Sequence, residues 1–156
     1  MIRTLFFEFP SDPTSWLIED EYMFGSDLLV APLMEEGNGR KVYLPPGSWI
    51  DYQTGKVYRG AEWHQISSGQ IPVVLLVKDH SVVPHIAVAQ STSQMNWNEI
   101  ELRVFSTDSS AATGLFALPQ GGLETLRLDA VQNGFGMKDD PLRGKVKWNI
   151  SRFKSQ

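Results

Sequence analysis

Three aspartates near the N-terminus are the first residues whose chemistry could be catalytic: Asp12, Asp20 and Asp27. Two carboxyl groups can share the roles of general acid and general base if they are positioned as matched partners. Asp12 precedes a proline, however, and Asp27 follows a Gly-Ser pair, which are positions where aspartate caps helices and closes turns. We therefore interpret these aspartates as capping and turn residues, and we predict no catalytic residue in the chain.

Metal ligands are the second candidate chemistry. Asp139 and Asp140 are adjacent carboxylates, but calcium takes six or more oxygens, and no further run of ligands is present. His64, His80 and His85 lack the close helical spacing of a zinc motif such as His-Glu-x-x-His. We predict an ordinary turn at the aspartate pair, surface or interface histidines, no metal site and no cofactor.

Four aromatic residues within a short span form the most informative local feature: Trp49, Tyr52, Tyr58 and Trp63. Flat rings can stack on sugar rings, so these residues are candidates for carbohydrate binding. Large aromatic side chains also bury much apolar area when they pack inside a protein. We favour the second interpretation, in which Trp49 and Trp63 pack inside the protein, and we keep carbohydrate binding as the alternative.

Two short motifs carry less weight. Gly134-Phe135-Gly136 lacks the third glycine and the following helix of a phosphate-binding loop, so we interpret it as a turn that interrupts the strand pattern. Asn149-Ile150-Ser151 matches the acceptor for N-linked glycosylation, but it lies inside a predicted strand, and we attribute the match to chance.

Composition limits the function classes. The 156 residues suit one domain of ordinary size, and a net charge of −4 argues against a nucleic-acid partner. The absence of cysteine excludes disulfides and zinc–thiolate sites. The start of the sequence lacks the pattern of a signal peptide, and no apolar run has membrane-spanning length, so we predict no membrane partner. Cytoplasm and periplasm are both compatible with the sequence.

Basic residues gather near the C-terminus, with no acid after Asp140: Arg143, Lys145, Lys147, Arg152 and Lys154. Several of them alternate with Val146, Trp148 and Ile150. Alternation of this kind is typical of a strand with one solvated face, and lysine on an edge strand discourages pairing with other chains. We interpret this end as an edge strand and predict no nucleic-acid binding.

The first 33 residues precede a long series of short strands. Residues 3–9 resemble a buried strand, Asp12 and Pro13 suit the start of a short helix that includes Trp16 to Met23, and residues 27–33 are predicted as a strand. Further short strands are expected at 41–44, 48–52, 56–58, 71–77, 82–84, 99–105, 115–118, 125–129 and 145–151. Strands at this spacing, with Gly and Pro between them, predict a mainly β chain with an antiparallel sandwich.

Three stretches together resemble one known family: Arg3-x-Leu5-Phe6-x-Glu8-Phe9-Pro10, Tyr22-Met23-Phe24-Gly25-x-x-Leu28-Leu29-Val30-Ala31-Pro32 and Tyr43-Leu44-Pro45-x-Gly47-x-Trp49-x-Asp51. They are similar to the region of glycoside hydrolase family 31 where the catalytic barrel passes into a proximal C-terminal β-sandwich. The run Val77-Lys78-Asp79-His80-Ser81 is closer to the bacterial α-xylosidase branch than to the α-glucosidases.

The resemblance implies a division of the chain. Residues 1–33 correspond to a remnant of the last β/α unit of a TIM barrel, residues 34–135 to the proximal β-sandwich, and residues 136–156 to a terminal strand or the start of a distal segment. The family's retaining mechanism needs two carboxyl groups about 5–5.5 Å apart. In the family both aspartates lie upstream of this region, so we expect the N-terminus to be a cut within a longer chain.

The resemblance also implies a function. We expect a non-catalytic supporting domain of an α-xylosidase-like enzyme, inactive alone, whose principal partner is the missing barrel. The alternative is a stand-alone carbohydrate-binding sandwich with an oligosaccharide ligand. Without the barrel, an exposed apolar surface is expected to cause self-association or disorder of the first ~25 residues. That surface would include Leu5, Phe6, Phe7, Phe9, Trp16 and Leu17.

Overall fold

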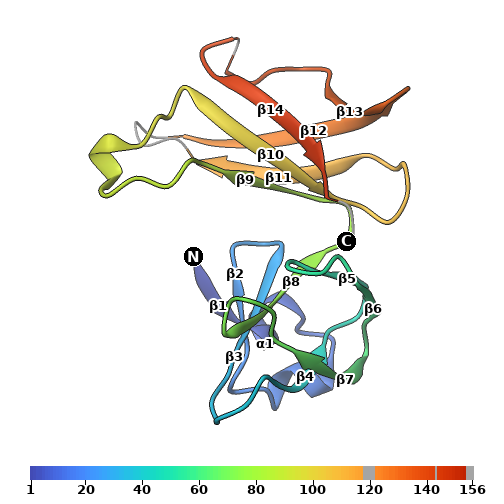
Figure 1. The fold of residues 1–156 in the computed structure, drawn as a ribbon. Coiled ribbons are helices and arrows are strands. Elements are labelled where there is room, and N and C mark those ends of the chain that lie inside the picture. The colour runs from blue at the N-terminus through green and yellow to red at the C-terminus, as the bar shows by residue number, and fades with distance from the viewer. Residues whose placement is uncertain (118–121, 143, 154–156) are drawn as a thin grey trace. The chain divides into compact units, whose positions relative to one another are not determined.

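The computed structural model describes residues 1–117, 122–142 and 144–153, which form two compact units (Figure 1). Unit 1 comprises Met1–Asp79 and unit 2 comprises His80–Phe153. The domain limits predicted after residues 33 and 135 remain predictions. Within the described ranges, no helix is long and apolar enough to cross a membrane.

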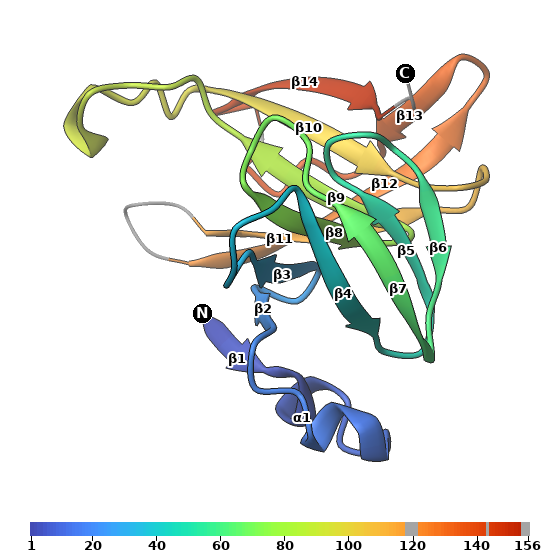
Figure 2. The same ribbon diagram turned by 60° about the horizontal axis from the view of Figure 1, so that its bottom comes forward.

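Unit 1 contains a six-stranded antiparallel sheet and a separate two-stranded sheet. Its elements are β1 (Ile2–Thr4), α1 (Leu5–Glu8), the 3₁₀ helix η1 (Pro13–Trp16), β2 (Tyr22–Phe24), β3 (Leu28–Pro32), β4 (Gly39–Leu44), β5 (Ser48–Asp51), β6 (Val57–Arg59), β7 (Glu62–Ser67) and β8 (Val73–Lys78). The large sheet has the order β1-β2-β3-β8-β5-β6, and β4 pairs with β7 (Figure 2).

The predicted strand at 27–33 is confirmed as β3, which lies between β2 and β8 in the large sheet. Its apolar residues alternate, so that Leu29 and Ala31 face the core. The same core contains Leu5 and Met23 from earlier elements and Trp49 from β5. Residues on both sides of position 33 therefore share one sheet and one core, because β3 pairs with β8 along its whole length.

The prediction of a single strand over residues 3–9 is wrong. The strand ends at Thr4, and Leu5–Glu8 form a helical turn in which the Phe9 N–H donates to the Leu5 carbonyl at 2.8 Å. In a strand, Leu5, Phe7 and Phe9 would point to one face, whereas residues i and i+4 share a face of a helix. The turn places Leu5 and Phe9 against the core and leaves Phe7 69% exposed.

The helix expected over Trp16 to Met23 is also corrected. The helical part is η1, which ends at Trp16, and Tyr22–Phe24 belong to strand β2. The start of the helix is as predicted, because the Asp12 carboxylate accepts from the Thr14 N–H at 3.2 Å and Pro13 occupies the first position. Pairing of β2 with β1 and β3 satisfies backbone groups that a longer helix would have used internally.

Unit 2 is a six-stranded sheet in the order β13-β12-β11-β9-β10-β14. Its elements are β9 (Ser81–His85), the 3₁₀ helix η2 (Thr92–Gln94), β10 (Glu99–Phe105), β11 (Ala112–Ala117), β12 (Leu123–Val131), β13 (Gly134–Met137) and β14 (Lys147–Arg152). The pairs β9–β11 and β10–β14 are parallel, and the others are antiparallel. The predicted mainly β fold is confirmed.

Alternation along β10 is confirmed, since Ile100, Leu102 and Val104 are buried in the core of unit 2.

The break predicted at residues 133–136 is wrong, because Gly134–Met137 form β13 and pair with the end of β12. A two-residue connection of Gln132 and Asn133 joins the strands. Gly134 has φ of +150°, which only glycine adopts without strain, so the glycine helps to close the hairpin.

Candidate functional site

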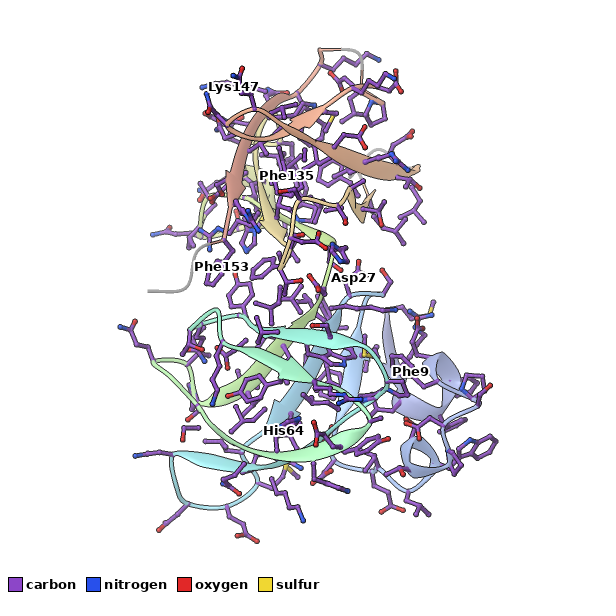
Figure 3. The ribbon with its side chains drawn as sticks, turned by 90° about the vertical axis from the view of Figure 1, so that its right-hand side faces the viewer. Phe9, Asp27, His64, Phe135, Lys147 and Phe153 are labelled. Atoms are coloured by element: carbon purple, nitrogen blue, oxygen red, sulfur yellow. The ribbon has the colours of Figure 1, made fainter. Side chains whose placement is uncertain are left out.

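The four aromatic candidates occupy different environments. Trp49 is fully buried; its indole N–H donates to the Pro45 carbonyl at 2.8 Å. Its ring lies 6.2 Å from that of Phe9, which is labelled in Figure 3 beside the N-terminal helical turn. Trp49 therefore joins the N-terminal segment to the core and has no face open to a ligand.

Trp63 is the most exposed of the four, at 45%. It lies on β7 opposite Tyr43 on β4, and their ring centroids are 5.4 Å apart. The Lys41 ammonium group lies 5.2 Å from the centroid of the Trp63 ring. The Tyr43 hydroxyl donates to the Asp12 carboxylate at 2.8 Å, which anchors the ring beneath Trp63.

Tyr58 and Tyr52 are both partly buried. Tyr58 packs against the core, with the His64 ring 5.1 Å away and the Lys56 ammonium group 4.8 Å from its ring centroid. His64, labelled in Figure 3, donates from Nε2 to the Arg59 carbonyl at 2.7 Å. The structure thus brings Tyr58 of β6 and His64 of β7 together, although the two strands belong to different sheets. His64 and Trp63 are adjacent on β7, so their side chains lie on opposite faces of the strand.

The predicted apolar surface near the N-terminus is present in part. Phe6 stacks between Phe7 and Trp16, with centroid separations of 4.4 Å and 5.4 Å. Trp16 is 59% exposed and Leu17 is 79% exposed. Leu5 does not belong to this surface, contrary to expectation, because it is fully buried in the core. We call Phe6, Phe7, Trp16 and Leu17 the aromatic surface.

A buried carboxyl group that sequence reasoning missed lies beside this region. Glu21 is 2% exposed, and its Oε1 atom accepts from the Tyr43 N–H at 2.8 Å. Its Oε2 atom is buried without a hydrogen-bond donor among the described residues. Removal from water is the largest cause that raises the pKa of Glu21 to about 7. An Asp-Glu pair between helix and strand carries no sequence signal of burial.

Arg40 on β4 holds the surrounding chain. Its guanidinium donates to the carbonyls of Pro32 at 2.8 Å and Asp20 at 3.1 Å, and it forms an ion pair with the Asp20 carboxylate. The same guanidinium lies 3.9 Å from Glu21, and its charge opposes the rise of the pKa of Glu21. Arg40 therefore ties β4 to the segment before β2 and to the end of β3.

The remaining acidic candidates have structural partners. Asp12 accepts from the Ser15 hydroxyl at 2.7 Å as well as from Tyr43, and Asp27 accepts from the Ser26 hydroxyl at 2.8 Å. The turn predicted at Asp139 and Asp140 is confirmed, since the Asp140 carboxylate accepts from the Leu142 N–H at 2.9 Å. Across the described residues, no group of three or more His, Cys, Asp or Glu side chains is placed to hold a metal ion.

The histidines do not converge. His80 Nδ1 lies 3.1 Å from the Ser106 hydroxyl, and His85 Nδ1 donates to the Val83 carbonyl at 2.9 Å. Burial is the largest cause that lowers the pKa of His85.

Of the basic C-terminal residues, Lys147 forms an ion pair with Glu99 on β10 at 2.8 Å. Arg143 and Lys154 lie outside the described residues.

The extent of unit 1 agrees with the extent of a protein-family match. The family model of the glycosyl hydrolase family 31 C-terminal domain matches residues 1–83, which is more than half of the chain. The chain belongs to glycoside hydrolase family 31. The matched residues include all of unit 1, with the buried Trp49, the aromatic surface and the Arg40 cluster.

Relatives of this family 31 chain carry several activities in their names. Alpha-glucosidase 2 of Bacillus thermoamyloliquefaciens is 32% identical over 114 residues, which are 72% of this chain and 14% of that protein. An alpha-xylosidase of Lactiplantibacillus pentosus is 34% identical over 86 residues, or 53% of this chain and 11% of that protein. The chain therefore spans only a small part of the length of these curated relatives.

A solved structure shares the fold of the family 31 chain. The family 31 dextranase of Flavobacterium johnsoniae, in complex with glucose, superimposes with a TM-score of 0.72 at 23% identity. The match covers 83% of this chain and 18% of the dextranase chain. At this identity the likeness concerns the fold alone, and it extends beyond the residues of the family match.

Proposed function

We propose that this chain is the non-catalytic C-terminal supporting part of a retaining α-glycosidase and that its natural partner is a catalytic barrel in the same protein. The observation that carries the proposal is the aromatic surface within the family-matched segment. Phe7, Trp16 and Leu17 expose large apolar areas, and clustered apolar residues of this kind mark interaction surfaces. These residues lie in residues 1–33, the segment that we propose to continue from the barrel.

The acidic residues support the non-catalytic part of the proposal. A retaining glycosidase needs a nucleophile and an acid/base group about 5–5.5 Å apart across the scissile bond. Asp12, Asp20 and Asp27 are each engaged with neighbouring hydroxyl, amide or guanidinium groups that fix turns and strands. We propose that catalysis by the whole protein uses carboxylates of the barrel.

The docking surface for the barrel would extend from the aromatic surface into a neighbouring pocket. This pocket has a volume of about 400 Å³ and is lined by Glu8, Phe9, Pro10, Ser11, Asp12, Pro13 and Pro46. Its residues come from the turn between α1 and η1 and from the β4–β5 connection. Fixed apolar shape next to stacked rings suits a permanent intramolecular contact.

For the substrate we propose α-xylosides or related α-glycosides. The run from Val77 to Ser81 supports this choice, as does the 34% identity to the alpha-xylosidase of Lactiplantibacillus pentosus. The test is hydrolysis of nitrophenyl α-xyloside and nitrophenyl α-glucoside by the whole protein that carries this chain. We expect faster release from the xyloside, and a preference for the glucoside would contradict the substrate assignment alone.

The supporting role is tested by a chimera. This chain replaces the matched segment of the Lactiplantibacillus pentosus alpha-xylosidase, and hydrolysis of nitrophenyl α-xyloside is measured. We expect an active chimera that loses most of its activity with Phe7→Asp and Trp16→Asp, because charge would disrupt the apolar contact. The same substitutions in the isolated chain serve as control and should leave its thermal stability nearly unchanged, since both side chains are exposed. An active chimera that tolerates both substitutions would contradict the docking role.

A stand-alone carbohydrate-binding module is the second candidate function. The exposed Trp63, with Lys41 over its ring, is the specific observation that favours it. If the chain is a stand-alone module, no barrel covers the aromatic surface. Activity of the chimera and its sensitivity to Phe7→Asp would therefore separate the two functions.

A further inference from the structure

We propose that the exposed face of the β4–β7 sheet binds a neutral saccharide, with Trp63 as the stacking platform and Lys41 and Gln65 as hydrogen-bonding groups. The proposal rests on the proposed function for the class of ligand, because the substrates of a glycosidase are saccharides. It adds a binding site that is formed by residues of strands β4 and β7 of this chain.

Strand register places these residues on one face. Tyr43 pairs with Trp63, and Lys41 pairs with Gln65, so the four side chains alternate in step on neighbouring strands. Ile66, which lies between Gln65 and the end of β7, is buried on the opposite face. The pair of strands, side by side in Figure 2, therefore has one core face and an opposite face that is exposed at Lys41, Trp63 and Gln65 but buried at Tyr43.

The platform is held in place from below. Trp63 is 45% exposed, while Tyr43 beneath it is only 4% exposed. The Tyr43 backbone N–H donates to buried Glu21, and its hydroxyl donates to Asp12. A ring that packs on a fixed neighbour loses little conformational freedom when a sugar stacks on it.

A polar pocket adjoins the platform. It has a volume of about 370 Å³, and its lining includes Lys41, Gln65, Asp20, Glu35, Glu36 and Arg40. Lys41 thus contacts both the Trp63 ring and the pocket, and Gln65 is two residues from Trp63 on the same strand face. A sugar that stacks on Trp63 would displace the Lys41 ammonium group from the ring and place its own hydroxyl groups within reach of these donors and acceptors.

The charges favour a neutral ligand. Three carboxylates and two cations line the pocket, and the Arg40 guanidinium is already engaged by Asp20 and by the Pro32 carbonyl. An anion would face Glu35 and Glu36, so the rim favours a neutral ligand over an anionic one. Sugar hydroxyl groups can both donate and accept, so a saccharide can satisfy this mixed rim.

The experiment is an NMR titration of the isotope-labelled chain that follows its indole N–H signals and its backbone amide signals, and the amide signals report affinity in the variants that lack Trp63. The chain has five tryptophans, and Trp63→Phe assigns the signal of Trp63. The probes are isoprimeverose, xylose and maltotriose. We expect the Trp63 signal to shift saturably with at least one disaccharide or trisaccharide. Trp63→Ala should weaken affinity roughly tenfold, and Gln65→Ala should weaken it a few-fold.

Trp63→Phe should retain most of the affinity, because it keeps an aromatic face. The matched control is Trp16→Ala, which removes an exposed tryptophan of the same unit and should leave saccharide affinity unchanged. The absence of any Trp63 shift with all three probes at high concentration would overturn the proposal, and so would saccharide binding that survives Trp63→Ala. An active chimera without saccharide binding would overturn this site while the proposed function stands.

Discussion

Unit 1 and unit 2 use their carboxyl groups in opposite ways. In unit 1, Glu21 is buried, has one oxygen without a donor among the described residues, and has a raised pKa because water is excluded. In unit 2, Glu99 and Glu101 lie on a solvated strand face, where hydrogen bonds from Lys147 and Arg103 lower their pKa values. Unit 1 therefore has buried polar links between segments, whereas the described carboxylates with shifted pKa values in unit 2 are superficial.

The two units also differ in the type of their exposed apolar side chains. Those of unit 1 include the rings of Phe7, Trp16, Phe24 and Trp63, while those of unit 2 are aliphatic: Val88, Leu115, Leu123 and Val131. Aromatic side chains are enriched where proteins bind partners. The contrast agrees with our proposals that unit 1 contacts a barrel and binds a saccharide. Each substitution below alters one of the two units.

The largest effect is expected for Trp49→Ala. Loss of a fully buried indole that packs on Phe9 and bonds to Pro45 should lower the free energy of unfolding by about 3–5 kcal/mol. Chemical denaturation measures this change in the free energy of unfolding. Hydrogen exchange should show that the amides of β3, β5 and β8 lose protection. Leu128→Ala in the core of unit 2 is the matched variant. Equal loss of protection in β10 and β12 from Trp49→Ala would contradict the separation of the two cores.

Arg40→Met should produce the next largest effect. The substitution removes the ion pair with Asp20 and the hydrogen bonds to two carbonyl groups, and it takes away the cation beside Glu21. Together these losses should lower the free energy of unfolding by about 3 kcal/mol at pH 8. Arg103→Met in unit 2 is the control, since its ion pair with Glu101 is solvated. Similar losses of unfolding free energy for the two variants would remove the distinction between buried and superficial links.

Glu21→Gln should stabilise the protein at high pH. The pKa of Glu21 is about 7 in the fold against 4.5 in its ordinary state, so the folded protein binds this proton more tightly than the unfolded chain. Its contribution to stability is therefore present below about pH 4.5 and is lost as the pH rises to about 7. Glutamine does not ionise and so avoids that loss. We therefore expect the free energy of unfolding to rise by roughly 2 kcal/mol at pH 8 and to change little at pH 4.

The measurement is urea denaturation of both proteins across this pH range, with the exposed Glu36→Gln as control. A destabilised Glu21→Gln variant at pH 8 would show that the ionised carboxylate contributes favourably, and it would reverse our interpretation of the cluster.

Glu99→Gln should have the smallest effect, with the opposite pH dependence. Hydrogen bonds from Lys147 and Asn149 lower the pKa of Glu99, so its contribution is present above the ordinary pKa and is lost as the pH falls. We expect a slight fall in melting temperature at pH 7 that salt diminishes, because the pair is solvent-exposed. A fall as large as that of Arg40→Met would break the comparison between the units.

The strands of unit 2 were more predictable than the polar links of unit 1. Strict alternation at Ile100, Leu102 and Val104 predicted β10 because one face of the strand is buried. The run Leu5-Phe6-Phe7 has no such period, and its helical turn depends on where the core lies. Burial of Glu21 depends on Arg40 and Tyr43, which are distant in the sequence, so local patterns could not indicate it. Trp63 was identified from its type, but its supporting Tyr43 required the strand register.

We propose that this family 31 chain supports catalysis without performing it. The most direct test is nitrophenol release from nitrophenyl α-xyloside and nitrophenyl α-glucoside by the purified chain at high protein concentration. Release no faster than in buffer is the predicted result. Release that is proportional to chain concentration and saturates with substrate would contradict the claim, because it would require a catalytic carboxylate pair within these 156 residues.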